Sequence, residues 1–235
     1  MLYTDPRLAA GDDGLVLRVS LHSTPDTAGQ DVQKSAEVTL VGKTRLARGL
    51  AVSPSGAWLV AVAGHKAYVA STTNLKEGFT KFVSPEALTC LAFHPSEEYF
   101  ATGDEKGTVR IWYCLNADMT SQVVAGVEKR APTTTLHWHA HSVSGLTFTP
   151  NGAYLLSGGE ESVMVIWQLH TGKKEFVPRV GAPILNISVS STRQEEYLLG
   201  LADASFILVN SASLKVARVF SRIRIGSSSS HSRCM

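Results

Sequence analysis

The chain has 235 residues, of which 44% are hydrophobic and 18% are charged, and its formal net charge is +2. This length and apolar fraction allow a packed core, and they exclude a highly charged, intrinsically disordered chain. The small net charge excludes a whole-surface field for nucleic acid or acidic lipid, so we expect any RNA contact to be local.

Five segments resemble one another, and each combines short apolar runs with turn residues. The first segment, residues 8–19, is similar to residues 100–111 within the third. Its apolar runs are of strand length, and helical periodicity is weak throughout the chain. Pro-Ser-Gly, Pro-Ser-Glu and Pro-Asn-Gly tripeptides supply turn chemistry between the runs. The other four segments are residues 49–62, 90–112, 145–167 and 186–209.

The spacing of these segments is regular. Pro54 and Pro95 are 41 positions apart, and Trp112 and Trp167 are 55 positions apart. A period of about 40–45 residues with several short strands is typical of a four-stranded propeller blade. We interpret the unit of 55 as a blade with an insertion, a surface loop within residues 115–134.

We therefore predict an all-β chain that forms an incomplete β-propeller of one partial and four four-stranded blades. Propellers usually close with about 4–8 blades, so this count suggests a fragment or a truncated product. The Ser-rich tail at residues 222–235 has low complexity and is predicted to be disordered. The propeller segment is residues 1–221, with blades at about 1–44, 45–84, 85–139, 140–181 and 182–221.

The fourth segment resembles a repeat of the WD-repeat β-propeller family. Gly158 and the Val-Ile-Trp run at 165–167 are similar to that family's blade-end motif, and His141 lies at its His-to-Trp spacing. The resemblance implies a buried hydrogen-bonded set of four side chains: His141, Ser157, Glu161 (where the family has Asp) and Trp167. In the third segment Lys106 stands at the position of the acid, so we expect no such set there.

A closer resemblance rests on longer stretches. Residues 88–96 (Leu-Thr-Cys-Leu-Ala-Phe-His-Pro-Ser), Leu-His-Trp-His at 136–139 and Phe-Val-Pro-Arg at 176–179 are similar to one family of nucleolar WD-repeat proteins, a subunit of the small-subunit processome. The resemblance implies a scaffold that assembles the processome on nascent pre-rRNA in the nucleolus. It implies support for small-subunit rRNA maturation and RNA polymerase I transcription. The implied partners are other WD-repeat subunits and pre-rRNA, bound directly or indirectly.

Motifs for catalysis, cofactors and membranes are missing from the sequence. It has no nucleophile elbow, phosphate-binding loop or dinucleotide fingerprint, and its paired acids fall in predicted turns. We predict no enzyme activity, no cofactor and no small-molecule substrate. The three cysteines, Cys90, Cys114 and Cys234, do not form a disulfide framework, which favours a reducing compartment. No apolar run approaches the ~18 residues of a membrane span, and the start does not read as a secretory signal.

One alternative uses the alternating residues His137, His139 and His141, which share one face of a strand and allow a metal site geometrically. We favour a structural role for them and predict no metal. A second alternative is a generic WD-repeat adaptor in a ubiquitin ligase or chromatin complex.

Basic residues gather in three places along the chain. Such clusters are typical of solvated loops, but they are also suited to sequence-independent contacts with RNA phosphates. Because no RNA-recognition motif with stacking aromatics is visible, we expect backbone contact rather than base reading. The phosphate-contact candidates are Lys43, Arg45, Arg48, Lys173, Lys174 and Arg179, and a third cluster is Arg218, Arg222 and Arg224.

Overall fold

The computed structural model describes the backbone of residues 5–10, 15–25 and 32–43, and the full residues 47–73, 78–116, 130–190 and 196–221. Nineteen β-strands and no α-helix occur in these ranges. Accordingly, the described part of the chain offers no helix with the length and apolar character needed to cross a membrane.

The strands form five antiparallel sheets, each a meander in chain order. The first sheet has three strands, β1 (Asp5–Ala10), β2 (Leu15–Pro25) and β3 (Val32–Lys43). The second has four, β4 (Gly49–Val52), β5 (Trp58–Ala63), β6 (Lys66–Ser71) and β7 (Thr80–Val83). The third comprises β8 (Leu88–Phe93), β9 (Phe100–Asp104), β10 (Thr108–Trp112) and β11 (Thr133–His137). The fourth comprises β12 (Val143–Phe148), β13 (Tyr154–Gly159), β14 (Met164–Gln168) and β15 (Lys174–Val177), and the fifth β16 (Ile184–Val189), β17 (Glu196–Leu201), β18 (Phe206–Asn210) and β19 (Val216–Phe220).

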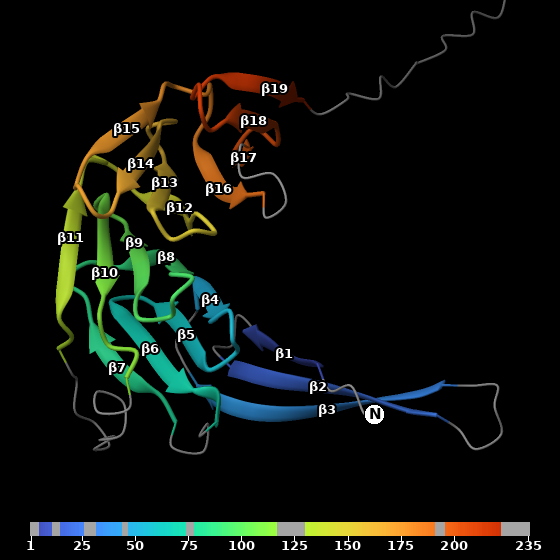
Figure 1. Cartoon of the computed structure of the whole chain (residues 1–235). Helices are drawn as coiled ribbons and strands as arrows, with labels where there is room; N and C mark the ends of the chain where they lie inside the picture. The colour runs from blue at the N-terminus through green and yellow to red at the C-terminus, as the bar shows by residue number, and fades with distance from the viewer. Residues whose placement is uncertain are drawn as a thin grey trace, which may run out of the picture.

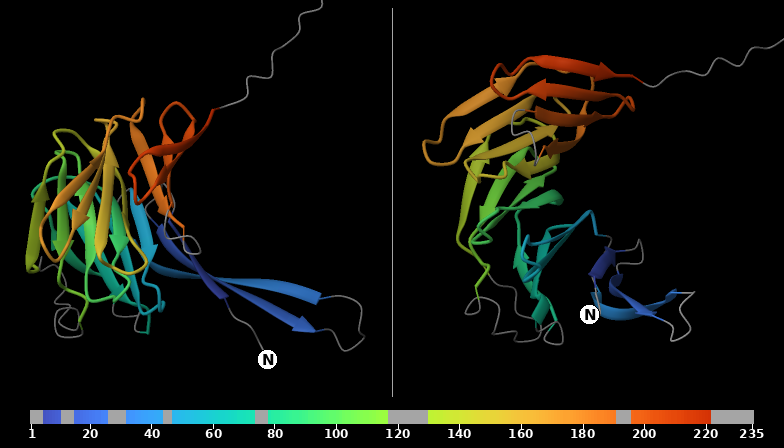
Figure 2. Two further views of the ribbon diagram at one scale, coloured as in Figure 1. Left: turned by 45° about the horizontal axis from the view of Figure 1, so that its top comes forward. Right: turned by 45° about the vertical axis from the view of Figure 1, so that its right-hand side comes forward.

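The sheets stand side by side in an arc that does not close (Figure 1). The first strands of neighbouring four-stranded sheets contact one another, β4 with β8, β8 with β12, and β12 with β16. Strands β7, β11, β15 and β19 lie on the outer side, and β2 and β3 project away from the arc (Figure 2). The prediction of an all-β, incomplete propeller is therefore confirmed.

The core lies between the sheets, which explains why central strands read as continuous apolar runs. Leu59, Val60, Ala61 and Val62 of β5 are all fully buried, because both faces of that sheet are covered. Apolar clusters fill the spaces between the second and third, third and fourth, and fourth and fifth sheets.

Glycines allow the closest approach between sheets. A Cβ at Gly158 would lie 2.9 Å from Ile184 Cδ1 of the next sheet, and one at Gly103 would lie 2.8 Å from Val143 Cβ. These backbones thus pack where any side chain would force the sheets apart.

The prediction of a surface loop within residues 115–134 is wrong for the last two residues, because Thr133 and Thr134 already belong to β11 and pair with β10. Residues 117–129 of that loop lie outside the described residues, and so does the predicted tail at 222–235.

Candidate functional site

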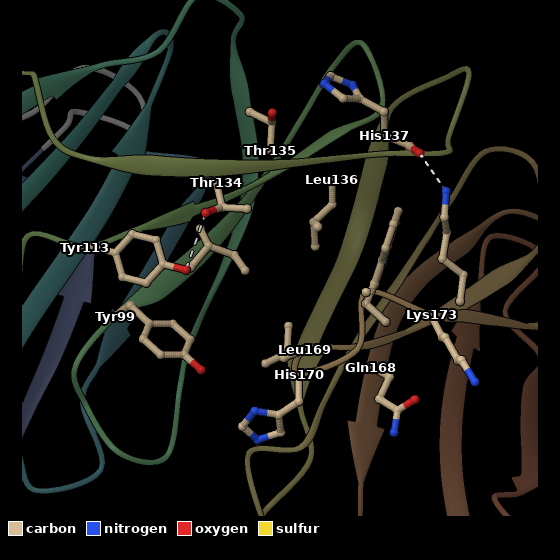
Figure 3. A pocket seen from close by; sticks show the side chains of 14 residues that line it. Tyr99, Tyr113, Thr134, Thr135, Leu136, His137, Gln168, Leu169, His170 and Lys173 are labelled. Atoms are coloured by element: carbon tan, nitrogen blue, oxygen red, sulfur yellow. Dashed lines mark hydrogen bonds between the residues drawn. The ribbon is translucent and has the colours of Figure 1, made fainter.

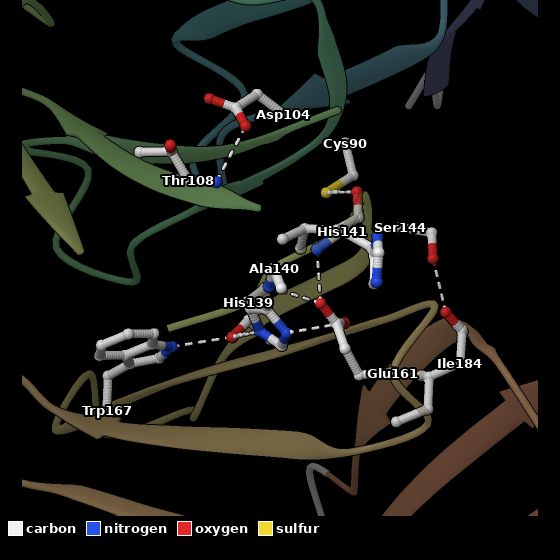
Figure 4. A network of polar contacts seen from close by, with 12 residues as sticks. Cys90, Asp104, Thr108, His139, Ala140, His141, Ser144, Glu161, Trp167 and Ile184 are labelled. Atoms are coloured by element: carbon white, nitrogen blue, oxygen red, sulfur yellow. Dashed lines mark hydrogen bonds and ion pairs between the residues drawn. The ribbon is translucent and has the colours of Figure 1, made fainter. Parts of the chain in front are cut away.

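A buried hydrogen-bonded set joins three elements of the fourth sheet (Figure 4). Trp167 Nε1 of β14 donates to Ser157 Oγ of β13 at 2.8 Å, and the same hydroxyl lies 2.8 Å from His139 Nε2. The other ring nitrogen, His139 Nδ1, lies 3.3 Å from Glu161 Oε2 in the β13–β14 turn. The set ties the loop before β12 to the middle of its own sheet.

The histidine of this set is His139, so the sequence-based choice of His141 is wrong. His139 is buried, whereas the side chain of His141 is exposed and its backbone N–H donates to Glu161 Oε1 at 2.6 Å. The chain turns between β11 and β12, and this turn directs the ring of His139 inward and that of His141 outward. The other three predicted members, Ser157, Glu161 and Trp167, do come together.

Burial and hydrogen bonding set the charges of this set. Desolvation lowers the pKa of His139, although Glu161 beside it acts in the opposite direction. Burial works against the charged form of Glu161, but backbone N–H donors, including those of His141 and Ala140, and the neighbouring His139 lower its pKa overall. At neutral pH the set therefore combines a neutral imidazole with a carboxylate.

The third sheet retains half of this set. Trp112 Nε1 donates to Thr102 Oγ1 at 2.8 Å, as Trp167 does to Ser157. Ser84 stands in the position of His139 and Lys106 in that of Glu161, so the histidine and the acid are missing. The expectation that the set is missing here is thus correct for the acid and histidine and wrong for the Trp–Thr bond.

The three alternating histidines do not converge. His137 is exposed on β11, and the ring of His139 is bound to Ser157 and Glu161. Within the described ranges, no three His, Cys, Asp or Glu side chains are grouped as metal ligands.

A cleft of about 360 Å³ lies between the outer parts of the third and fourth sheets (Figure 3). Tyr99 and Tyr113 form one wall, with ring centroids 5.4 Å apart, and Thr134 Oγ1 donates to the Tyr113 hydroxyl at 3.5 Å. Lys173 and Lys174 form the opposite wall with the turn before β15.

The cleft is basic and partly aromatic. Its lining includes two lysines and two histidines but no acid: Lys173, Lys174, His137 and His170. Lys174 Nζ donates to the carbonyl oxygen of His137 at 3.3 Å and lies 5.3 Å from the centre of the Trp167 ring. This arrangement suits an anionic chain bound by charge and by contact with flat rings. The Lys173-Lys174 pair is visible in the sequence, whereas Tyr99 and Tyr113 reach the cleft only through sheet packing.

The remaining phosphate-contact candidates are dispersed. Arg179 is exposed in the segment after β15, and exposed Arg48 forms an ion pair with Glu105, with Nη1 3.2 Å from the carboxylate. Lys43 is the last residue of β3, and only its backbone is described. Arg45 lies outside the described residues. In the third cluster Arg218 is exposed on β19, while Arg222 and Arg224 fall outside the described ranges.

The chain matches a known protein family over most of its length. The model of the family described as the first beta-propeller of WD repeat-containing protein 75 matches residues 30–197. This range includes the hydrogen-bonded set and the cleft.

Curated relatives match over shorter stretches. WD repeat-containing protein 75 of Danio rerio is 41% identical over 115 residues, which is 48% of this chain and 13% of the relative. U3 small nucleolar RNA-associated protein 17 of Schizosaccharomyces pombe is 44% identical over 79 residues, 34% of this chain and 10% of the relative. The chain thus spans about a tenth of the length of the relatives it matches.

A solved structure shares the fold. A chain in the crystal structure of the mitotic checkpoint complex superposes with a TM-score of 0.66 and 15% sequence identity, covering 91% of this chain and 62% of that one. At this identity the likeness concerns the fold alone.

Proposed function

Because the chain belongs to the family of the first beta-propeller of WD repeat-containing protein 75, we propose that it acts in ribosome biogenesis as a non-catalytic scaffold. The family match over residues 30–197 carries this proposal. The name of one relative, U3 small nucleolar RNA-associated protein 17, points to the same process. An arc of sheets that presents loops on its rims suits a role in assembly.

The finer proposal places the chain in the nucleus and nucleolus. There it helps to assemble the small-subunit processome on nascent pre-rRNA, with other WD-repeat subunits as partners. This role supports rRNA processing and RNA polymerase I transcription. We expect neither a small-molecule substrate nor a membrane among its partners.

We propose that the cleft of Figure 3 makes the local contact with RNA. Lys173 and the two histidines present positive or ionisable groups, and the lining holds no acid to repel a phosphate. Each phosphate contact adds affinity that falls with salt and does not depend on base sequence. Exposed Arg179 serves as a second contact nearby in sequence.

Affinity purification of the tagged chain from growing cells tests the proposal, with probing of the eluate for the 5′ spacer of pre-rRNA with and without nuclease. A family-length protein serves as the positive control. Recovery of processome proteins and spacer RNA is expected. Recovery of a ubiquitin-ligase or chromatin complex instead would favour the adaptor alternative.

The cleft is tested by replacing Lys173 and Lys174 with Glu. The matched charge control replaces Lys81 and Lys215 with Glu, because both are exposed and lie outside the cleft. We expect the double variant to bind single-stranded RNA at least tenfold more weakly at about 0.1 M salt, because it loses two favourable charges and gains two unfavourable ones. Equal losses in the control would show that only net charge matters.

A further inference from the structure

A second cavity, of about 500 Å³, lies between the second and third sheets. One wall is the end of β7 and the residues that follow it, Val83, Ser84 and Pro85. The other wall belongs to β10, the start of β11 and the segment before it. That wall is lined by Arg110, Trp112, Arg130, Ala131 and Thr133.

Two residues that line this cavity each carry a buried donor without a partner. The hydroxyl of Ser84, a residue only 1% exposed, has no hydrogen bond, and neither has the buried Nε–H of Arg110. A buried group that stays unsatisfied lowers the stability of the fold, and more so where it is charged. Within the described residues these are the two buried side-chain atoms left unpaired, and both line the same cavity.

The guanidinium of Arg110 is held so that one edge stays free. Its Nη1 donates to Thr133 Oγ1 at 3.3 Å, and its Cζ lies 5.9 Å from the centre of the Trp112 ring. The Nε–H lies on the other edge, which an arginine uses for two parallel hydrogen bonds to an oxyanion, and it has no protein partner.

Hydrogen bonds also fix the opposite wall of the cavity, which Ser84 and Pro85 line. The backbone N–H of Ser84 donates to the carbonyl oxygen of His65 at 2.8 Å, and His65 Nδ1 lies 3.1 Å from the carbonyl oxygen of Pro85. Two arginines and no acid are among the eight residues that line the cavity. Ser84 occupies the position that His139 has in the next sheet, where the imidazole Nε2 lies 2.8 Å from Ser157 Oγ.

We propose that this cavity binds the carboxylate side chain of an acidic peptide segment supplied by a protein partner. Because both donor atoms are buried, the side chains of Arg110 and Ser84 turn toward the entering carboxylate. The carboxylate then accepts two hydrogen bonds from the Nε edge of Arg110 and one from the Ser84 hydroxyl, and Arg130 at the exposed rim adds charge. A carboxylate on a short stem reaches between two sheets, whereas a backbone phosphate of RNA is flanked by bulky riboses. Two lining cations also suit one acidic side chain better than a run of phosphates. This inference does not rest on the proposed role in ribosome biogenesis, because its test contains no ribosomal component.

Nuclear magnetic resonance on the full chain tests the site through the ¹H–¹⁵N signals of Arg110 Nε and Trp112 Nε1. The probes are sodium acetate, sodium chloride as an ionic-strength control, the blocked pentapeptide Gly-Gly-Glu-Gly-Gly, and its Gln counterpart. We expect acetate and the Glu peptide to shift both signals saturably. Chloride and the Gln peptide should leave them in place. A lack of any saturable shift with acetate or the Glu peptide would overturn the proposal.

Substitutions separate binding from folding. Arg110→Lys keeps the charge but loses the planar fork, and Ser84→Ala removes the hydroxyl; each should weaken acetate binding about tenfold, read from the Trp112 signal. Arg218→Lys is the matched control, since Arg218 is exposed on β19 and does not line the cavity. Unchanged binding in both site variants would contradict the proposal. A uridine decamer that shifts the same signals at lower concentration than the Glu peptide would replace the peptide with RNA as the occupant.

Discussion

His139 and His141 carry the same side chain two positions apart, yet only the first joins the buried set with Ser157 and Trp167. His139→Ala leaves the Ser157 hydroxyl and Glu161 without their imidazole partner and opens a cavity. We expect it to lower the free energy of unfolding by about 2–4 kcal/mol. His141→Ala, the control, removes an exposed ring and should change stability by about 0.5 kcal/mol or less. Urea unfolding of both variants measures the difference. Equal losses in the free energy of unfolding would contradict the assignment of His139, rather than His141, to the set.

The lowered pKa of His139 predicts how stability depends on pH. Its folded-state pKa lies below the ordinary value of 6.5, so as the pH falls through 6.5 the unfolded chain takes up the proton first. The free energy of unfolding should therefore decrease between about pH 7 and pH 5. Glu161 adds a loss of the same sign below pH 4.5, because its folded-state pKa is also lowered.

Urea unfolding at pH 7.5, 6 and 5 checks this pH dependence. The His139→Gln variant should show a smaller decrease than the unmodified chain, because Gln does not titrate. His141→Gln should retain the full decrease. If the His139→Gln variant loses as much stability between pH 7.5 and pH 5 as the unmodified chain, His139 is not the titrating group.

At the level of single residues, the sequence predicted the chemistry of the set but not its full membership. Strand register fixes the positions of Ser157 and Trp167, and their places within the repeat identify them. The histidine lies in a loop, where the alternation of three histidines gives no signal of which ring turns inward. The cavity between the second and third sheets could not be predicted either, because Ser84 and Arg110 come to line it only through the packing of two sheets.

Between elements, the glycines of equivalent strands offer a matched comparison. Gly158 of β13 packs against Ile184, whereas a Cβ at Gly200, the equivalent position of β17, would meet nothing closer than 3.5 Å. Gly158→Ala should cost about 1–3 kcal/mol through overpacking, while Gly200→Ala should be neutral or slightly stabilising. Thermal unfolding of the two variants checks this. Similar melting temperatures would mean that the sheets adjust freely to an added methyl group.

The elements themselves were largely predictable because each repeat encodes them locally. Turn residues such as Pro54 and Pro150 mark the hairpins, and apolar runs mark strands buried on both faces. The start of β11 was missed because its sequence, Thr-Thr-Thr-Leu-His, is largely exposed and has no strong apolar alternation. Its pairing with β10, rather than its own sequence, defines it as a strand.

At the scale of the whole molecule, the arc leaves one apolar sheet face exposed within the described residues. Leu198 and Phe206 of the fifth sheet are 38% and 50% exposed, whereas their equivalents in the fourth sheet, Leu156 and Met164, are fully buried against the fifth. The same positions of the repeat thus form core in one sheet and surface in the next. Exposed apolar side chains of this kind favour self-association.

This contrast gives a prediction about solubility and stability together. Replacing Leu198 and Phe206 with Ser should lower dye binding to apolar surface and reduce light scattering from concentrated solutions, while the free energy of unfolding changes by about 1 kcal/mol or less. The same changes at Leu156 and Met164 should cost more than about 4 kcal/mol, because each buries a polar group and leaves a cavity. If the Leu198 and Phe206 variant is as unstable as the buried pair, then this face is covered in solution, and a second copy would be the occupant to test by its molar mass.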